Sequence, residues 1–255
     1  MLNKTAAGDL AQKFKIDVFT VYREYLQLLF LKNIYALKKS GRLFFKGGTA
    51  VRFLLGGFRF SEDLDFTAGL SREETAGLVL GAVNSLNKEV EIQFKPEKDF
   101  PQSYSGKIYQ RLDEFNFPLT IKVEISLREE VFSSDTRYIE TVFPLSPYPL
   151  AVVMGFEEML AEKIRALLTR NKGRDIFDLW FFLSKGVKIN WELVNKKMAL
   201  YQKTAGFKDL ENAVVDFSDK ELEGDLKRFL PLDQRKVVKE IKALALESLR
   251  KTQSD

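Results

Sequence analysis

Two neighbouring segments of the chain combine residue types that could act on a phosphate. The first, Phe45-Lys46-Gly47-Gly48-Thr49-Ala50, places a glycine pair and a threonine before a helical pattern. The second, Arg59-Phe60-Ser61-Glu62-Asp63-Leu64-Asp65-Phe66, places two carboxylates on a short predicted strand. Backbone N–H groups at a helix start favour an anion, and paired carboxylates favour a divalent cation. Together the segments predict chemistry on a nucleoside triphosphate.

The two aspartates lie two residues apart, so both side chains face the same side of a strand while Leu64 and Phe66 face the core. Such a pair repels unless a cation lies between the carboxylates. Glu124 lies on the polar face of the alternating segment 120–127, and three carboxylates can converge on metal ions if the two strands are neighbours. Solvated residues at a strand end, or on the wet face of a sheet, would explain the same pattern.

The glycine pair has two interpretations as well. Gly47 and Gly48 would let the backbone approach a phosphate closely, and Lys46 would add positive charge. A glycine pair followed by a capping threonine, Thr49, is also an ordinary turn from strand to helix. In that case Lys46 is only a lysine at a strand end.

A third group of candidates lies in two predicted helices further along the chain. Lys163 falls in the middle of an apolar helical stripe, where a lysine is costly unless it meets a carboxylate or a phosphate. Arg170 shares that stripe. Asp175 and Asp178 lie three residues apart on the next helix and share a face. Alternatives are a lysine whose ammonium reaches solvent and a purely structural network of ion pairs.

Composition limits the chemistry that these residues can perform. The chain of 255 residues contains neither cysteine nor histidine, which removes thiol nucleophiles, disulfides, thiolate metal sites and imidazole bases. Catalysis must therefore use carboxylates, lysine, arginine, hydroxyls or backbone groups. Any metal ion is expected to be hard and bound by oxygen, such as Mg²⁺ or Mn²⁺.

Charge and hydropathy give weaker indications about partners and location. The net charge is +4 and the excess of cations is spread along the chain, which permits a nucleic-acid partner without requiring one. No apolar run approaches the roughly 20 residues of a membrane span. The N-terminus shows no signal-peptide pattern. We therefore expect a cytoplasmic protein with no membrane partner.

The predicted elements describe an α+β fold with two domains. Domain 1–150 should be α/β, and domain 151–255 should be helical, with Pro144, Pro147 and Pro149 marking a linker or a last edge strand. Predicted helices are 9–40, 49–55, 71–86, 155–171, 174–184, 190–203, 207–229 and 231–250. Gly56 is expected to end the second of these, and a capping box at Ser71 is expected to begin the third. Predicted strands are 43–45, 64–66, 90–94, 107–112 and 120–127.

Taken in order, these motifs resemble the AbiEii/AbiGii nucleotidyltransferases, which include the MenT-type toxins of type IV toxin–antitoxin and phage-defence systems. The resemblance spans about residues 45–180. It is carried by the segments 45–50 and 59–66, by Lys122-Val123-Glu124, by Glu157-Glu158-Met159-Leu160-Ala161-Glu162-Lys163-Ile164-Arg165-Ala166-Leu167, and by Arg174-Asp175-Ile176-Phe177-Asp178-Leu179.

The resemblance implies a polymerase-beta-like nucleotidyltransferase fold, a mixed sheet with flanking helices, and a C-terminal helical bundle that completes the active site. It also implies an NTP donor, Mg²⁺ or Mn²⁺, the tRNA 3′ end as one acceptor, and a cognate antitoxin. The residues implied as catalytic are Asp63, Asp65, Lys163 and Asp178, and those implied as metal ligands are Asp63, Asp65 and Glu124. Nucleotide contacts would come from Lys46, Gly47, Gly48, Thr49, Arg59, Ser61, Lys163 and Asp175.

One position departs from the pattern of the family. Its second motif usually reads Lys-x-Asp, whereas this chain has Lys122-Val123-Glu124. The extra methylene moves the carboxylate by about one C–C bond, which keeps open a nucleotide-binding module that has lost turnover. Nucleotidyl transfer to a protein or a small molecule is a further alternative.

Overall fold

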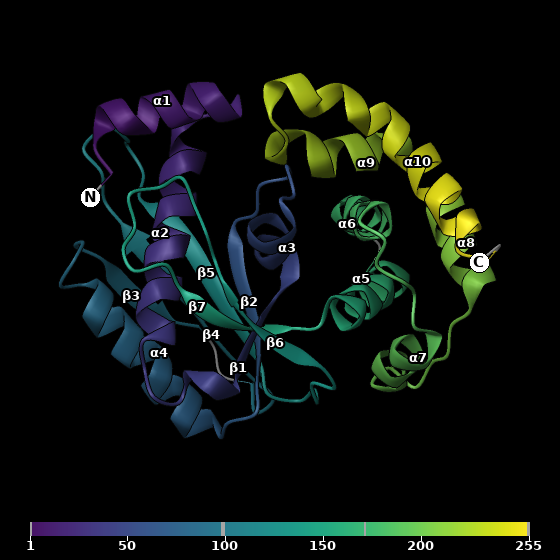
Figure 1. The fold of residues 1–255 in the computed structure, drawn as a ribbon, viewed down its shortest axis with the longest axis horizontal. Helices are drawn as coiled ribbons and strands as arrows, with labels where there is room; N and C mark the ends of the chain where they lie inside the picture. The colour runs from purple at the N-terminus through teal and green to yellow at the C-terminus, as the bar shows by residue number, and fades with distance from the viewer. Residues whose placement is uncertain (1, 98–99, 171, 254–255) are drawn as a thin grey trace. The chain divides into compact units, whose positions relative to one another are not determined.

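The computed structural model describes residues 2–97, 100–170 and 172–253 (Figure 1). The chain divides into two units, Met1–Met154 and Gly155–Asp255. The first unit contains a mixed sheet with helices packed on it. The second contains only helices among its described residues.

The sheet of the first unit has seven strands in the described residues, in the order β3-β4-β5-β2-β1-β7-β6. The pairs β1–β7 and β2–β5 are parallel, and the other pairs are antiparallel. The strands are β1 (Leu43–Lys46), β2 (Asp63–Ala68), β3 (Gln93–Pro96), β4 (Ser103–Gln110), β5 (Leu119–Ser126), β6 (Ser134–Tyr138) and β7 (Leu150–Met154).

Alternation along the central strands separates a polar face from an apolar one. Leu64 and Phe66 of β2 are 0% and 1% exposed, while Asp63 and Asp65 between them are partly exposed. The helix α2 (Val18–Tyr35) packs against β5 and β7, and α4 (Arg72–Leu86) packs against β4 and α2 (Figure 1). The apolar side of the sheet therefore lies in the core while the two aspartates lie on its polar side.

The prediction of one helix over 9–40 is wrong. The chain forms α1 (Lys4–Phe14) and then α2, separated by Lys15 in the left-handed region at φ 53°. Asp17 caps the second helix by accepting a hydrogen bond of 2.8 Å from the Thr20 amide. Helix-forming residues on both sides of this break hide it in the sequence.

The region around the glycine pair also differs from its predicted boundaries. Gly47 and Gly48 belong to the first turn of α3 (Gly47–Leu55), which ends at the predicted C-cap Gly56 with φ 70°. The capping box predicted at Ser71 is confirmed at the start of α4. Predicted strands 90–94 and 107–112 are shifted, because β3 begins at Gln93 and β4 ends at Gln110.

The segment after Pro149 is a strand before it becomes helical. β7 includes Ala151–Met154, which the sequence assigned to the helical part, and it lies between β1 and β6 rather than at the sheet edge. Of the two alternatives for the proline segment 144–149, the last edge strand is therefore wrong, and these residues form a connection without strand structure that leads into β7. Parallel pairing with β1 and antiparallel pairing with β6 bury its apolar run.

The helical unit contains shorter helices than the periodicity suggested. Its helices are α5 (Phe156–Arg170), α6 (Gly173–Ser184), α7 (Trp191–Ala199), α8 (Phe207–Val215), α9 (Asp219–Leu226) and α10 (Val238–Lys251), with short 3₁₀ segments at Lys227–Phe229 and Leu232–Val237. The predicted end of the first of these at 171 lies outside the described residues. The predicted fold class, α+β with a mixed sheet, flanking helices and a helical C-terminal part, is confirmed.

The lengths and hydropathy of the helices bear on membrane insertion. Within the described residues, no helix is both long and apolar enough to cross a bilayer.

A buried ion pair joins two helices of the second unit. The Lys197 ammonium of α7 lies 2.6 Å from the Glu158 carboxylate of α5 and 3.5 Å from that of Glu162. The side chains of Lys197 and Glu158 are 2% and 0% exposed. Removing the lysine alone would leave a buried carboxylate without its cation, which is far more costly than losing a surface pair.

We therefore expect Lys197→Ala to destabilise the chain by about 3–5 kcal/mol in urea unfolding monitored by circular dichroism. The neighbouring Lys196 pairs with Glu192 at 2.7 Å on the surface and provides the matched control, since Lys196→Ala should change stability by about 0.5 kcal/mol or less. The double change Lys197→Met with Glu158→Leu should recover part of the loss. Equal destabilisation by the two alanine variants would contradict this description of the pair.

Candidate active site

The first turn of α3 lies directly against the aspartate strand. β1 pairs with β2 in a register that sets Lys46 opposite Asp65, so the helix starts beside this aspartate. Gly47 has φ 81°, in the region that favours glycine, and a Cβ there would lie 2.7 Å from Cγ of Asp65 and overlap its carboxylate. The missing side chain is what lets the Asp65 carboxylate reach the backbone of α3.

Gly48 allows a second close approach to the start of α3, by the guanidinium of Arg59 and the hydroxyl of Ser61. A Cβ at Gly48 would lie 2.5 Å from Nη2 of Arg59 and 3.0 Å from Oγ of Ser61. Arg59 is only 3% exposed, and its Nη1 donates a hydrogen bond of 3.1 Å to the Phe60 carbonyl. The positive charge of Arg59 is therefore fixed at the start of α3.

Thr49 fastens the helix start to β2. Its hydroxyl donates a short hydrogen bond to the backbone carbonyl of Asp63, and the residue is 1% exposed. The N-cap residue Lys46 makes no side-chain cap for α3. Because the N-terminal amides and the helix dipole both favour negative charge, this turn is suited to an anion.

The carboxylates of β2 are oxygen donors of the type that a hard divalent cation prefers. Asp63 and Asp65 lie on the polar face of the sheet, and β2 and β5 are neighbours in a register that pairs Asp65 with Glu124. This is the strand arrangement that convergence of three carboxylates requires. Two oxygen donors on one face suit Mg²⁺ or Mn²⁺.

The carboxylate of Glu124 pairs with Lys122 on the same strand. Its Oε1 lies 2.6 Å from Nζ of Lys122, which also lies 3.3 Å from the Glu97 carboxylate. No group of three or more acidic side chains in the described ranges is placed to hold a metal ion. Burial lowers the pKa of Lys122, but the hydrogen bond to Glu124 and the charges of both glutamates raise it overall. This ammonium therefore stays protonated at neutral pH.

Lys46 has a buried partner that sequence reasoning missed. Its ammonium lies 3.5 Å from Oε2 of Glu129, and the two side chains are 10% and 2% exposed. Glu129 follows β5 and lies 83 residues away in sequence. An acidic residue in a polar loop gives no signal for such a contact.

The long helix α2 contacts both the loop before β2 and the helix α3. The Gln27 amide donates a hydrogen bond of 3.1 Å to the Ser61 carbonyl, and Glu24 accepts from Arg52 of α3 at 3.0 Å. Arg52 also lies over the Phe60 ring, with Cζ 3.5 Å from the centroid. Burial raises the pKa of Glu24, and Arg52 opposes that rise. Polar residues within the apolar sequence of α2 were the available signal for these contacts.

The remaining predicted site residues form a cluster inside the helical unit. Nζ of Lys163 lies 2.7 Å from Asp178 and 3.6 Å from Asp175. Arg170 binds both oxygens of Asp175 at 2.9 Å, and the two aspartates are 1% exposed or less. Lys163 therefore has the carboxylate partners that a lysine on an apolar helical stripe requires. Both interpretations of this lysine, a structural network of ion pairs and a catalytic role, predicted such contacts.

The first unit therefore brings together most of the residues predicted for nucleotide and metal binding. Gly47, Gly48 and Thr49 meet side chains or backbone of Arg59, Ser61, Asp63 and Asp65 within one sheet and one helix start. Glu124 is adjacent in register. Lys163, Asp175 and Asp178 are brought together with one another in the second unit.

Two solved structures share this fold. The crystal structure of JHP933 from Helicobacter pylori matches with a TM-score of 0.64 at 22% identity, covering 94% of this chain and 95% of that one. The structure of a candidate nucleotidyltransferase from H. pylori matches with a TM-score of 0.63 at 21% identity, covering 92% and 96%. At these identities the likeness establishes the fold.

A search of curated proteins finds no match. The sequence does match a family model, described as nucleotidyl transferase AbiEii toxin of a type IV toxin–antitoxin system, over residues 29–242. This range contains both the turn of α3 with its aspartate strand and the cluster around Lys163. The chain belongs to the AbiEii nucleotidyltransferase toxin family.

Proposed function

We propose that the chain transfers a nucleoside monophosphate from an NTP to an acceptor hydroxyl. The observation that carries this proposal is the start of α3, where a helix N-terminus, a buried arginine and a pair of aspartates occupy one small region. Family membership supports the reaction class. The donor, the metal ion and the acceptor are parts of the proposal.

The triphosphate would bind at the N-terminus of α3. Amides of Gly47, Gly48 and Thr49 would donate hydrogen bonds to phosphate oxygens, and no side chain on either glycine blocks the approach. Arg59 would neutralise phosphate charge with its planar guanidinium, and the Ser61 hydroxyl beside it would donate a further hydrogen bond. Lys46, ion-paired with Glu129, would contribute at longer range.

Asp63 and Asp65 would hold Mg²⁺ or Mn²⁺, with Glu124 as a further ligand once its carboxylate leaves Lys122. A divalent cation held by these carboxylates would orient the triphosphate and make the acceptor hydroxyl easier to deprotonate. The reaction forms a bond between the acceptor oxygen and the α-phosphorus, breaks the bridging bond to the β-phosphate and releases pyrophosphate. Because the chain has no histidine, the acceptor proton would pass to a carboxylate or to solvent.

The helical unit would contribute residues from the last two segments of the family resemblance, 157–167 and 174–179. Lys163 would contact the nucleotide, and Asp178, with Asp175 beside it, would hold the lysine in place through the ion pairs observed at 2.7 and 3.6 Å. In this proposal Arg170 positions Asp175.

The biological role that we propose follows from the family. The chain would act in the cytoplasm as the toxin of a type IV toxin–antitoxin or phage-defence system, with a cognate antitoxin as its genetic partner. The tRNA 3′ end is the acceptor that we propose first.

The proposal is tested with Asp63→Asn and Asp65→Asn, measured by pyrophosphate release and by transfer of α-labelled NTP to total tRNA in the presence of Mg²⁺. We expect each variant to lower kcat by about 100-fold or more, because the site loses a charge that the transition state requires. Asp135→Asn is the matched control, since Asp135 lies on the exposed strand β6. Transfer that survives in the Asp63 and Asp65 variants would contradict the proposal.

Gly48 provides a test of the proposed phosphate site. Gly48→Ala would force Arg59 and Ser61 away from the helix start, so we expect KM for the NTP to rise by about 10-fold or more, which corresponds to about 1.4 kcal/mol. Gly77→Ala in α4 is the control, because no atom lies within 4 Å of a Cβ there. An unchanged KM in Gly48→Ala, measured by steady-state pyrophosphate release, would exclude the phosphate from this turn.

A second candidate function, nucleotide binding without turnover, is favoured by the contact between Glu124 and Lys122. If Glu124 takes part in metal binding, Glu124→Gln should raise the Mg²⁺ concentration needed for half-maximal activity several-fold, while Lys122→Met should not. Calorimetry that shows tight NTP binding by the unmodified chain, without pyrophosphate release on any acceptor, would instead support the binding module.

A further inference from the structure

An open groove in the helical unit is lined mainly by cations. It has a volume of about 360 Å³ and lies between the end of α9 and the 3₁₀ segment Leu232–Val237. We call it the α9 groove, and its lining residues are Glu223, Gly224, Lys227, Arg228 and Arg235. Gly224 has no neighbour within 4 Å of a Cβ position, so the helix backbone is accessible from solvent.

The charge of this groove is not balanced by its own acids. Lys227 pairs with Glu223 at 3.1 Å, and the five lining residues carry a net charge of +2, from three cations and one carboxylate. Three cations close together repel one another unless an anion lies between them. The groove is therefore suited to a negatively charged ligand.

Arg228 of the groove shares one aromatic ring with Arg174 of α6, which is not a lining residue. Cζ of Arg228 lies 4.5 Å from the centroid of Phe229, and Cζ of Arg174 from α6 lies 5.0 Å from it. Asp225 adds one negative charge and accepts a hydrogen bond of 2.9 Å from the Gly173 amide. With Arg174 and Asp225 included, the net charge remains +2. The ring restrains the planar groups, which reduces the entropy lost when they bind phosphate oxygens.

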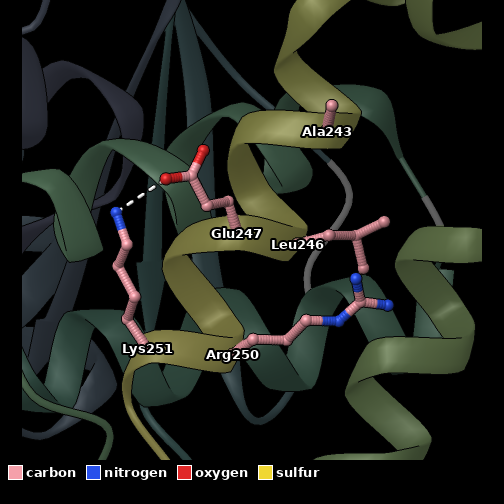
Figure 2. Close-up of a pocket in the computed structure, with 5 residues that line it drawn as sticks. All are labelled: Ala243, Leu246, Glu247, Arg250 and Lys251. Atoms are coloured by element: carbon pink, nitrogen blue, oxygen red, sulfur yellow. Dashed lines mark hydrogen bonds and ion pairs between the residues drawn. The ribbon is translucent and has the colours of Figure 1, made fainter.

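A second cavity in the same unit is also lined by two cations and a carboxylate. It has a volume of about 470 Å³ and is lined by Ala243, Leu246, Glu247, Arg250 and Lys251 of α10 (Figure 2). Glu247 and Lys251 reach toward each other at 2.7 Å, and Arg250 pairs with Glu211 at 2.8 Å. With Glu211 included, the two cations and two carboxylates of this cavity sum to zero, so it provides an internal comparison for the α9 groove, whose charge with its neighbours is +2.

We propose that the α9 groove binds the phosphate backbone of a nucleic acid, the acceptor of the transfer reaction. This inference rests on the proposed function and extends it to residues that the nucleotide site does not use. Arginines and a lysine that line a concave surface match the spaced oxygens of a phosphate chain, and Arg binds phosphate through two parallel hydrogen bonds. A backbone contact of this kind positions the acceptor without reading its sequence.

The test measures RNA binding by the full chain without NTP, using fluorescence anisotropy of a short fluorescein-labelled RNA and competition by total tRNA. We expect Lys227→Gln with Arg235→Gln to weaken binding by about 10- to 50-fold at about 100 mM salt. Loss of two phosphate contacts should also lower the slope of log K against log salt by about 1.5.

The matched control removes the same charge elsewhere in the helical unit. Lys196 and Lys251 each pair with a glutamate four residues away, as Lys227 does. Lys196→Gln with Lys251→Gln should therefore leave RNA affinity and the salt slope nearly unchanged. An equal loss in both double variants would overturn the proposal, because binding would then follow net charge and not the groove.

Two further measurements separate the remaining explanations. If the double groove variant fails to fold, the single change Lys227→Gln is used, since this side chain is 56% exposed and its pair is on the surface. Groove-dependent binding to vesicles containing phosphatidylserine, with RNA affinity unchanged, would overturn the proposal in favour of a lipid surface. Because the binding assay contains no NTP, it can fail while nucleotidyl transfer is intact, and it can succeed if transfer is absent.

Discussion

The geometry of the candidate site depends on how closely the first turn of α3 approaches β2. Gly47 and Gly48 have no side chains, so the Asp65 carboxylate, the Arg59 guanidinium and the Ser61 hydroxyl all reach the helix start. The hydrogen bond from Thr49 to the Asp63 carbonyl fixes the helix to the strand. A larger residue at either glycine would separate the start of α3 from the aspartates, and the triphosphate site that we propose would lose its geometry.

The rest of the first unit holds this approach in place. The antiparallel register of β1 and β2 sets the start of α3 opposite Asp65, and buried contacts from Gln27 and Glu24 of α2 hold the loop and the helix that form the site. Rigid support is what electrostatic catalysis requires, because charges must be placed before the transition state forms. The helical unit has its own buried network around Lys163, which keeps this ammonium between two carboxylates.

Local patterns predicted the parts of the fold that depend on neighbouring residues. Alternation identified β5 and the polar side of β2, and a capping box identified α4. Contacts between distant segments left no such signal, as for Lys46 with Glu129. The helix break at Lys15 and the strand Leu150–Met154 were missed because flanking residues favour helix and tertiary pairing decides the outcome. Glu124 was placed on the right face, but its pairing with Lys122 depends on side-chain conformation.

The proposed function requires that one site, the start of α3 beside Asp63 and Asp65, binds the triphosphate of the donor. The most direct measurement is a crystal structure of the chain with Mn²⁺ and an α,β-methylene NTP, whose modified bond resists cleavage. We expect phosphate oxygens at the amides of Gly47 and Gly48, with anomalous density for Mn²⁺ beside the two aspartates. A nucleotide bound elsewhere, or Mn²⁺ bound away from both aspartates, would contradict this assignment.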